Sequence, residues 1–169
     1  MSIIRTINGH EPQFGKDCWL SETAVVVGEV EMGDNCTVWY NAIVRGDVNY
    51  IKIGNKTNIQ DGAVIHCTYK KAATEIGSNV SIGHNAIVHG CTLEDNVLIG
   101  MGAIIMDHAV VKSGSIIGAG AIVLQNQIVE ANSVYVGNPA KKVKDIGEEG
   151  VGLIERTANN YIKYAGWFQ

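Results

Sequence analysis

The sequence predicts an all-β fold, a parallel β-helix followed by a C-terminal helix, and three observations support it. Large apolar residues return every six positions, small residues stand two positions before many of them, and the chain has 20 glycines but only 2 prolines. A period of six matches neither the 3.6 of an α-helix nor the 2 of an ordinary strand. It is the period of hexapeptide repeats, in which each repeat is one short strand and a turn.

The large apolar positions of the repeat, called anchors here, are all aliphatic or methionine except the last. They are Leu20, Val26, Met32, Val38, Val44, Ile53, Ile59, Ile65, Ile76, Ile82, Val88, Leu93, Ile99, Ile105, Val111, Ile117, Val123, Val129 and Tyr135. In proteins with such repeats, three repeats form one triangular coil and the winding is left-handed, against the usual right-handed crossover. We therefore expect a left-handed β-helix of about six coils over residues 20–136. Anchors should point inward, and Gly or Asn should take the φ > 0 turn positions.

The register of the repeat breaks in three places. Three residues are added between Val44 and Ile53, five are added between Ile65 and Ile76, and one is missing between Val88 and Leu93. Such irregularities are either tolerated bulges or markers of a binding face. Because the segment 67–75 follows His66 directly, we favour a functional role for it.

The ends of the chain depart from the repeat. We expect residues 1–139 to form the β-helix domain, with residues 1–19 as a strand or loop covering the first coil. Residues 140–169 should form a C-terminal helical segment packed on the β-helix, because AKKVKDI and VGLIERTANNYIKYAGWF look helical. Their apolar stripe at helical spacing comprises Val151, Ile154, Ala158, Tyr161, Ile162 and Ala165.

Composition limits the function. A formal net charge of -4 and an isoelectric point near 5.7 argue against a nucleic-acid partner. We expect no membrane association, because no run of 18 apolar residues and no signal peptide is visible. The cysteines Cys18, Cys36, Cys67 and Cys91 show no CxxC spacing, so we expect reduced thiols and a cytoplasmic protein.

Three histidines are the candidate metal ligands. His66 and His89 each follow an anchor directly, and these anchors are three repeats apart, so both imidazoles should point outward from the same face of adjacent coils. His84 follows its anchor by two residues on a different face. One prism cannot easily bring the three together, but threefold association can. We therefore predict a homotrimer in which His84 of one chain meets His66 and His89 of the next. Three His ligands leave a fourth zinc position open for water.

Other residues of these types have simpler explanations. We expect His10 and His108 to be ordinary surface residues and Cys36 and Cys91 to fill small corner positions of the core. Cys67, beside His66, remains a less favoured alternative ligand.

The chain resembles the γ-class carbonic anhydrases and their carbonic-anhydrase-like relatives, in a short-loop form. The resemblance covers residues 10–140 and rests on VWYNAIVRGD, NIQDGAVIHC, SIGHNAIVHGC, IGMGAIIMD and VGNPAKKV. It implies that His66, His84 and His89 bind Zn²⁺, with Fe²⁺ or Co²⁺ as alternatives. It also implies reversible hydration of CO₂ to bicarbonate by a metal-bound hydroxide at the trimer interface.

The resemblance also implies roles for residues around the metal ligands. Arg45 and Asp47 correspond to the family's arginine and aspartate at the subunit contact, where an ion pair that only stabilises the trimer is an equal alternative to a catalytic contribution. Asp61 corresponds to the second carboxylate of that network. Gln60 corresponds to the residue near the bound water and Asn58 to the residue that orients it, although both residue types also suit turns and surfaces.

Two features differ from the best-studied form of that family. Val48 stands where a proton-transferring glutamate follows the RxD motif, and the loop after His66 is short and carries Lys70 and Lys71, with Glu75 at its end. We therefore expect slow proton export. The alternatives are an acyl-CoA-dependent acyltransferase with one His as general base, a metal-dependent thioester hydrolase, and a trimeric scaffold with a vestigial metal site.

Overall fold

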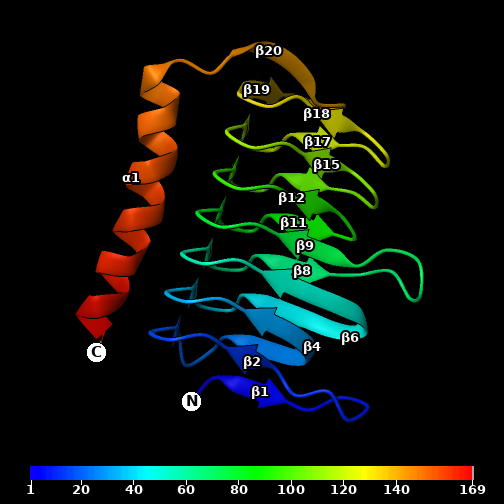
Figure 1. Cartoon of the computed structure of the whole chain (residues 1–169), viewed down its shortest axis with the longest axis vertical. Coiled ribbons are helices and arrows are strands. Elements are labelled where there is room, and N and C mark those ends of the chain that lie inside the picture. The colour runs from blue at the N-terminus through cyan, green and yellow to red at the C-terminus, as the bar shows by residue number, and fades with distance from the viewer. Residues whose placement is uncertain (169) are drawn as a thin grey trace.

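The computed structural model describes residues 1–168 and shows a left-handed parallel β-helix with one C-terminal helix (Figure 1). The prism has three faces. The first, the helix face, is a parallel ladder of seven strands, one from each coil. These are β3 (Trp19–Leu20), β5 (Thr37–Val38), β7 (Asn58–Ile59), β10 (Ser81–Ile82), β13 (Leu98–Ile99), β16 (Ile116–Ile117) and β19 (Ser133–Val136).

The other two faces share the two longest strands, β4 (Val25–Met32) and β6 (Ile43–Ile53), which turn through the corner between them. The histidine face comprises their first halves with β1 (Ile3–Arg5), β8 (Val64–His66), β11 (Ile87–His89), β14 (Ile104–Ile105) and β17 (Ile122–Val123). The outer face comprises their second halves with β2 (Gln13–Phe14), β9 (Thr74–Ile76), β12 (Thr92–Leu93), β15 (Val110–Val111) and β18 (Ile128–Val129).

The predicted anchors form the core. All of them are buried except Leu20, which is half-buried, and the small residues two positions earlier are buried with them. Register partners stack directly, as in the run Val44, Ile65, Val88, Ile105 and Val123. Corners take φ > 0 as predicted, for example at Asn85 (φ 57). The fold class predicted from the repeat is therefore confirmed.

The number of coils differs from the prediction, because the helix face counts seven rather than about six. The additional coil comes from residues 1–20, where β1 pairs with β4, β2 pairs with β4, and β3 pairs with β5, all in parallel. The N-terminal segment covers the coil that follows it, and it does so as a coil of the same stack. The six-residue period is not visible in its sequence.

The helix predicted for AKKVKDI is wrong. Residues Lys141–Asp145 form β20, which pairs antiparallel with β19 at the end of the stack. Only six residues separate Pro139 from Ile146, too few for a stable isolated helix. The last rung meanwhile offers an unpaired strand edge, and β20 covers it.

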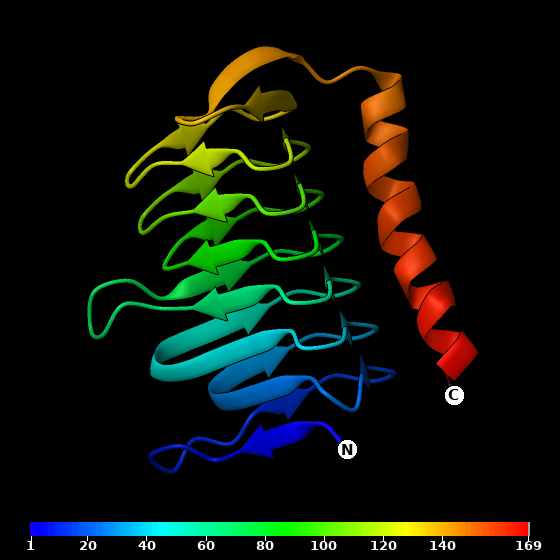
Figure 2. The ribbon, with the colours of Figure 1, turned by 180° about the vertical axis from the view of Figure 1, so that it is seen from behind.

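Helix α1 (Glu148–Ala165) then runs back along the helix face and contacts β5, β7 and β10 (Figure 2). A short 3₁₀ turn, Gly166–Phe168, follows it. Ile154, Ala158 and Ala165 of the predicted stripe are buried, whereas Val151 is 47% exposed. Among residues 1–168, no helix is long and apolar enough to cross a membrane.

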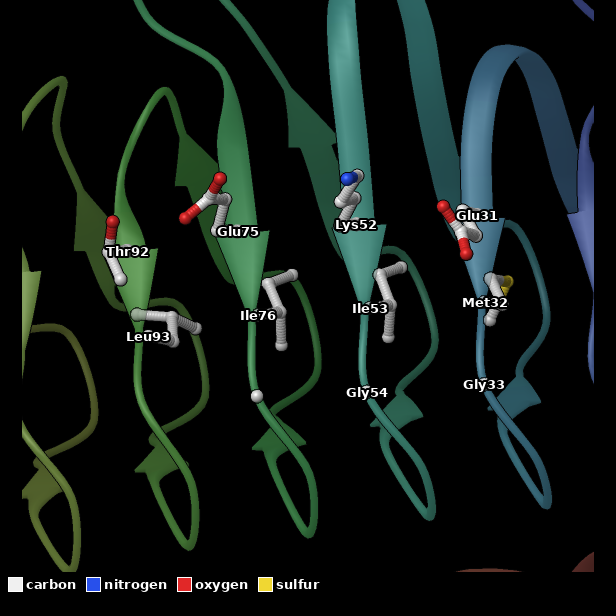
Figure 3. Close-up of a pocket in the computed structure, with 11 residues that line it drawn as sticks. Glu31, Met32, Gly33, Lys52, Ile53, Gly54, Glu75, Ile76, Thr92 and Leu93 are labelled. Carbon is white, nitrogen blue, oxygen red and sulfur yellow. The ribbon is translucent and has the colours of Figure 1, made fainter.

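The two faces that α1 does not cover differ in polarity. On the outer face, Glu31, Lys52, Glu75 and Thr92 are register partners and form an outward polar row (Figure 3). On the histidine face, the corresponding outward row is Val25, Ile43, Val64, Ile87, Ile104 and Ile122, which is entirely aliphatic. Parallel sheets are normally covered on both sides. The aliphatic row therefore marks the histidine face as a surface that needs a cover.

Candidate metal centre

The ladder brings His66 and His89 together. They are register partners at the ends of β8 and β11, and His66 Nδ1 lies 3.1 Å from His89 Nε2. Asp47 Oδ1 lies 3.0 Å from His66 Nε2, and Arg45 Nη1 donates a 2.6 Å hydrogen bond to Asp47 Oδ2. We call Arg45, Asp47, His66 and His89 the His66–His89 cluster. It stands at the C-terminal edge of the histidine face.

In each ring of this pair, the nitrogen that does not face the second histidine contacts a carboxylate. His66 Nε2 faces Asp47, and His89 Nδ1 lies 2.5 Å from Asp107 Oδ1. A carboxylate on one imidazole nitrogen fixes the tautomer and leaves the other nitrogen free as a ligand. The free nitrogens are then His66 Nδ1 and His89 Nε2, which are the two that face each other.

The pKa values of these groups keep the carboxylates ionised. Burial opposes ionisation of Asp47, but hydrogen bonds from Arg45 and His66 outweigh it and hold the pKa of Asp47 below its ordinary value. The pKa of Asp107 is lowered in the same way, by hydrogen bonds from Thr68 and His89 that exceed the effect of burial. Burial lowers the pKa of His66, which favours its neutral form at pH 7.

This arrangement fits a metal ion. When both rings are neutral and donate to their carboxylates, two lone pairs face each other at 3.1 Å, which only a shared proton or a cation makes favourable. Two nitrogens on a tetrahedral zinc ion, each about 2.0–2.1 Å from it, are about 3.3 Å apart. The separation and the donor type are therefore those of two ligands to one ion.

His84 lies elsewhere in the protomer. It follows β10 at the corner where the histidine face begins, and its Nδ1 lies 2.9 Å from Asp61 Oδ2. Gln60 precedes Asp61 on the same corner, and its side chain donates to Asn58 Oδ1 at 3.0 Å. We call Asn58, Gln60, Asp61 and His84 the His84 cluster.

Asn58 and Gln60 are buried rather than on the surface, with 1% and 6% exposed. Asn58 Nδ2 donates to Ser81 Oγ at 2.8 Å, so the two carboxamides form a chain that is fixed by its partners. An ordered carboxamide at the corner can direct a water or an oxyanion, whereas a mobile surface residue cannot.

Within one protomer the two clusters do not meet. Among residues 1–168 no three His, Cys, Asp or Glu side chains are grouped so as to hold a metal ion. The clusters stand at opposite edges of the histidine face, with the aliphatic row between them. Each edge therefore carries part of the candidate ligand set.

The sequence analysis missed two residues at the site. Asp107 lies one coil beyond His89, and counting repeats could have found this carboxylate. The hydroxyl of Tyr161 of α1 lies 3.3 Å from His84 Nε2, and burial raises the pKa of Tyr161 to about 12, so the hydroxyl keeps its proton. No repeat could have placed Tyr161, because α1 lies outside the coils.

Cys67, the less favoured alternative ligand, makes its contacts in the core. Cys67 is buried, and its thiol donates to the Tyr50 carbonyl in the core. His10 lies 3.8 Å from Glu29 on the surface, and His108 occupies a corner with φ 60.

Two cavities among the described residues differ in their position relative to the predicted site. A groove of about 520 Å³ lies along the polar row of the outer face and includes none of the predicted site residues (Figure 3). A mainly apolar cavity of about 360 Å³ lies beside His89, lined by Ile87, Ile104, Ile105, Met106, Asp107 and Gln125. The second cavity is the one that borders a candidate ligand.

Comparisons with known proteins agree with the hexapeptide repeat. The family profile "Bacterial transferase hexapeptide (six repeats)" matches residues 90–125. A protein of Methanocaldococcus jannaschii named "Probable carbonic anhydrase" is 48% identical over 148 residues, which cover 88% of this chain and 92% of that protein.

"Gamma carbonic anhydrase 2, mitochondrial" of Arabidopsis thaliana is 40% identical over 159 residues, covering 91% of this chain. The chain spans 57% of the length of that plant relative. Among solved structures, the hexapeptide transferase family protein of Anaplasma phagocytophilum superposes with a TM-score of 0.94 at 35% identity, covering 99% of this chain and 98% of the other.

Proposed function

The chain belongs to the γ-class carbonic anhydrase family of hexapeptide-repeat proteins, and from this premise we propose that it is a metal-dependent enzyme that hydrates CO₂ reversibly to bicarbonate at a subunit interface. The site would comprise the His66–His89 cluster of one protomer and the His84 cluster of the next. The observation that carries the proposal is that a carboxylate lies within hydrogen-bond distance of one ring nitrogen of each of the three histidines, which leaves the other nitrogen available as a ligand.

The shape of the protomer supports a closed trimer. The two clusters flank one aliphatic face, so the C-terminal edge of one protomer can meet the corner of the next in a head-to-tail contact, and such contacts form rings when the rotation closes. Apolar side chains on and beside that face are exposed in the protomer, namely Ile87 (37%), Met101 (59%), Met106 (39%) and Leu124 (43%). Burial of such a surface favours association.

The roles of the chain's own residues follow from their contacts. Asp47 would orient the ring of His66, and Asp61 would orient His84, with the nitrogen that Tyr161 now contacts left as the ligand. Arg45, whose side chain is 42% exposed, neutralises Asp47 and faces the edge where the neighbour would pack.

The fixed carboxamides of Gln60 and Asn58 would orient the water or bicarbonate oxygen by hydrogen bonds. The apolar cavity beside His89 would admit the nonpolar substrate CO₂. A zinc ion held by three neutral imidazoles supplies the remaining chemistry, because it lowers the pKa of a bound water towards about 7. Fe²⁺ or Co²⁺ would also suit imidazole ligands.

A second candidate function is acyl transfer from an acyl-CoA thioester. It is favoured by the transferase names of the matching family profile and of the Anaplasma protein. In that case one histidine would act as general base and no metal would be needed. Release of CoA from acetyl-CoA by chelator-treated protein would support transfer, whereas release that requires added Zn²⁺ would indicate thioester hydrolysis at the metal centre.

Subunit complementation tests the shared site. His84→Ala and His89→Ala each remove one ligand from every interface, so neither variant alone should retain bound metal or CO₂ hydration activity. In mixed trimers of the two variants in equal amounts, about one quarter of the interfaces should be intact. An intact interface needs His66 and His89 from a His84→Ala chain and His84 from a neighbouring His89→Ala chain. Metal per chain by elemental analysis and stopped-flow CO₂ hydration are the measurements.

His10→Ala is the matched control, since His10 is exposed and belongs to neither cluster. This variant should keep the metal content and rate of the unchanged protein. Failure of the mixture to regain any metal, with both variants folded and trimeric, would contradict a shared site. Bound metal with no CO₂ hydration would contradict the proposed reaction and leave thioester hydrolysis as the explanation.

A further inference from the structure

Asp107 makes contacts that the proposed ligand set does not explain. It follows β14 in the coil after His89, and its side chain is 23% exposed. One carboxylate oxygen lies 2.5 Å from His89 Nδ1, and the other accepts a 2.5 Å hydrogen bond from Thr68 Oγ1. Both oxygens are therefore engaged, and together they fix the plane of the carboxylate.

Thr68 comes from the segment that breaks the six-residue register. Its backbone N–H donates to Ala72 O at 2.9 Å, its carbonyl accepts from Lys71 and Ala72, and Asn49 Nδ2 lies 3.4 Å from the same carbonyl. The loop between β8 and β9, which projects from the stack in Figure 1, is thus folded back on itself at Thr68. Its closure holds the threonine hydroxyl toward Asp107.

Gly90 provides the space for this arrangement. Its φ is +55, and a Cβ at this position would lie 2.6 Å from Asp107 Oδ1 and 2.8 Å from Ala72 Cβ. Any larger residue directly after His89 would therefore push the carboxylate from the ring or displace the loop. The glycine, the aspartate and the threonine form one constellation around His89.

We propose that Asp107, held by Thr68, is a positioning residue that fixes the His89 ring with Nε2 directed at the metal, so that the loop after His66 sets the affinity of the site for a divalent cation. This inference rests on the proposed function for the identity of the ligand. The orientation of the ring does not depend on it, because the contacts of Asp107 are present in the protomer. The five-residue insertion of the repeat would then be needed to place Thr68.

The first measurement is the affinity for Zn²⁺ of the chelator-treated trimer, by competition with a chromophoric chelator. Loss of a partner that orients a metal-binding histidine weakens metal affinity by about 10–100-fold, which is the effect expected for Asp107→Asn. Thr68→Val should weaken it by about fivefold, the scale of one lost hydrogen bond, and Thr68→Ser should restore it because serine keeps the hydroxyl. Asp145→Asn, on the exposed strand β20, is the matched control and should leave the affinity unchanged.

A second readout separates this proposal from the proposed function. The nitrogen NMR signals of His89 in the metal-free protein should show the proton on Nδ1, and Asp107→Asn should abolish that preference. A proton on Nε2 in the unchanged protein, or Asp107→Asn with unchanged Zn²⁺ affinity and an unchanged Co²⁺ absorption spectrum, would overturn the role of Asp107. Failure to bind metal together with the proton on Nδ1 would instead overturn the proposed function and the effect on affinity, while upholding the positioning of the ring.

Discussion

At the scale of single residues, the chemistry depends on which ring nitrogen each histidine leaves free. His66 and His89 are one rung apart, and Asp47 and Asp107 hold their outer nitrogens. The same pair without these carboxylates would present either nitrogen and would bind a cation less tightly. The spacing of the histidines thus brings two rings together, and the aspartates determine how the rings are turned.

The carboxylates at the site are bonded to histidines, which limits how protons can leave it. Asp47 and Asp107 each contact a histidine ring, and position 48 is a half-buried valine. Glu75, at the end of the loop after His66, lies on the outer face and accepts a 2.8 Å hydrogen bond from the hydroxyl of Tyr50. In the proposed reaction the released proton would therefore pass to solvent directly, which agrees with the slow proton export expected from the sequence.

The resulting prediction concerns external buffer. CO₂ hydration should rise with imidazole concentration at pH 7, and Val48→Glu should raise the rate at low buffer by about tenfold, less than the ~10²–10⁴-fold contribution of a well-positioned general acid–base group. Stopped-flow assays at several buffer concentrations measure both effects. Val48→Gln is the control, since it has a similar size but no titratable group. A rate independent of buffer in the unchanged protein would show that proton export is not limiting.

At the scale of elements, a period of six identified the strands because every anchor faces the core. The helical appearance of AKKVKDI gave a wrong prediction, because residues 141–145 form a strand instead. Local propensity is weak in so short a segment, and the open ladder of β19 supplied the hydrogen bonds. The free edge of the last coil exists only in the tertiary structure, so no local sequence pattern predicts which segment pairs with it.

Helix α1 allows a test of packing at the same scale. Ile154 is 2% exposed and packs against the helix face, whereas the neighbouring Leu153 is 40% exposed. Ile154→Ala should lower the free energy of unfolding by about 2–5 kcal/mol through lost burial and the remaining cavity. Leu153→Ala should cost less than about 1 kcal/mol. Denaturant unfolding at one fixed protein concentration measures both, and equal losses would show that α1 does not depend on this stripe.

At the scale of the whole molecule, the three faces of the prism have different environments. Helix α1 covers one face, the row with Glu31, Lys52 and Glu75 makes part of another polar, and the histidine face is aliphatic and uncovered. In the proposed function, the clusters at its two edges would form a three-histidine site only with a neighbouring chain. Oligomerisation and metal binding should then be coupled.

A charge on the histidine face tests that coupling. Ile87→Glu should convert the trimer to monomers and abolish metal binding while the β-sheet circular dichroism is retained, because a carboxylate would be desolvated in the interface. Ile128→Glu is the matched control, since Ile128 is 59% exposed on the outer face, and this variant should remain trimeric. Light scattering after size-exclusion chromatography gives the mass. A trimeric Ile87→Glu protein with full metal content would place the subunit contact elsewhere.

The sequence by itself determined the coil, the inward anchors and the pairing of His66 with His89. In a repeat of fixed period, the number of residues between two positions sets where each of them lies in the fold. It predicted the candidate ligands and, through resemblance, the roles of the carboxamides of Asn58 and Gln60, but not their burial. Only the tertiary structure decided what the period cannot encode. The contact of Thr68 with Asp107, the contact of Tyr161 with His84 and the covering of the last rung by β20 each involve a segment outside the regular repeat. Such contacts depend on where loops and helices fold back, and their energies come from packing and hydrogen bonds between residues that no local spacing relates.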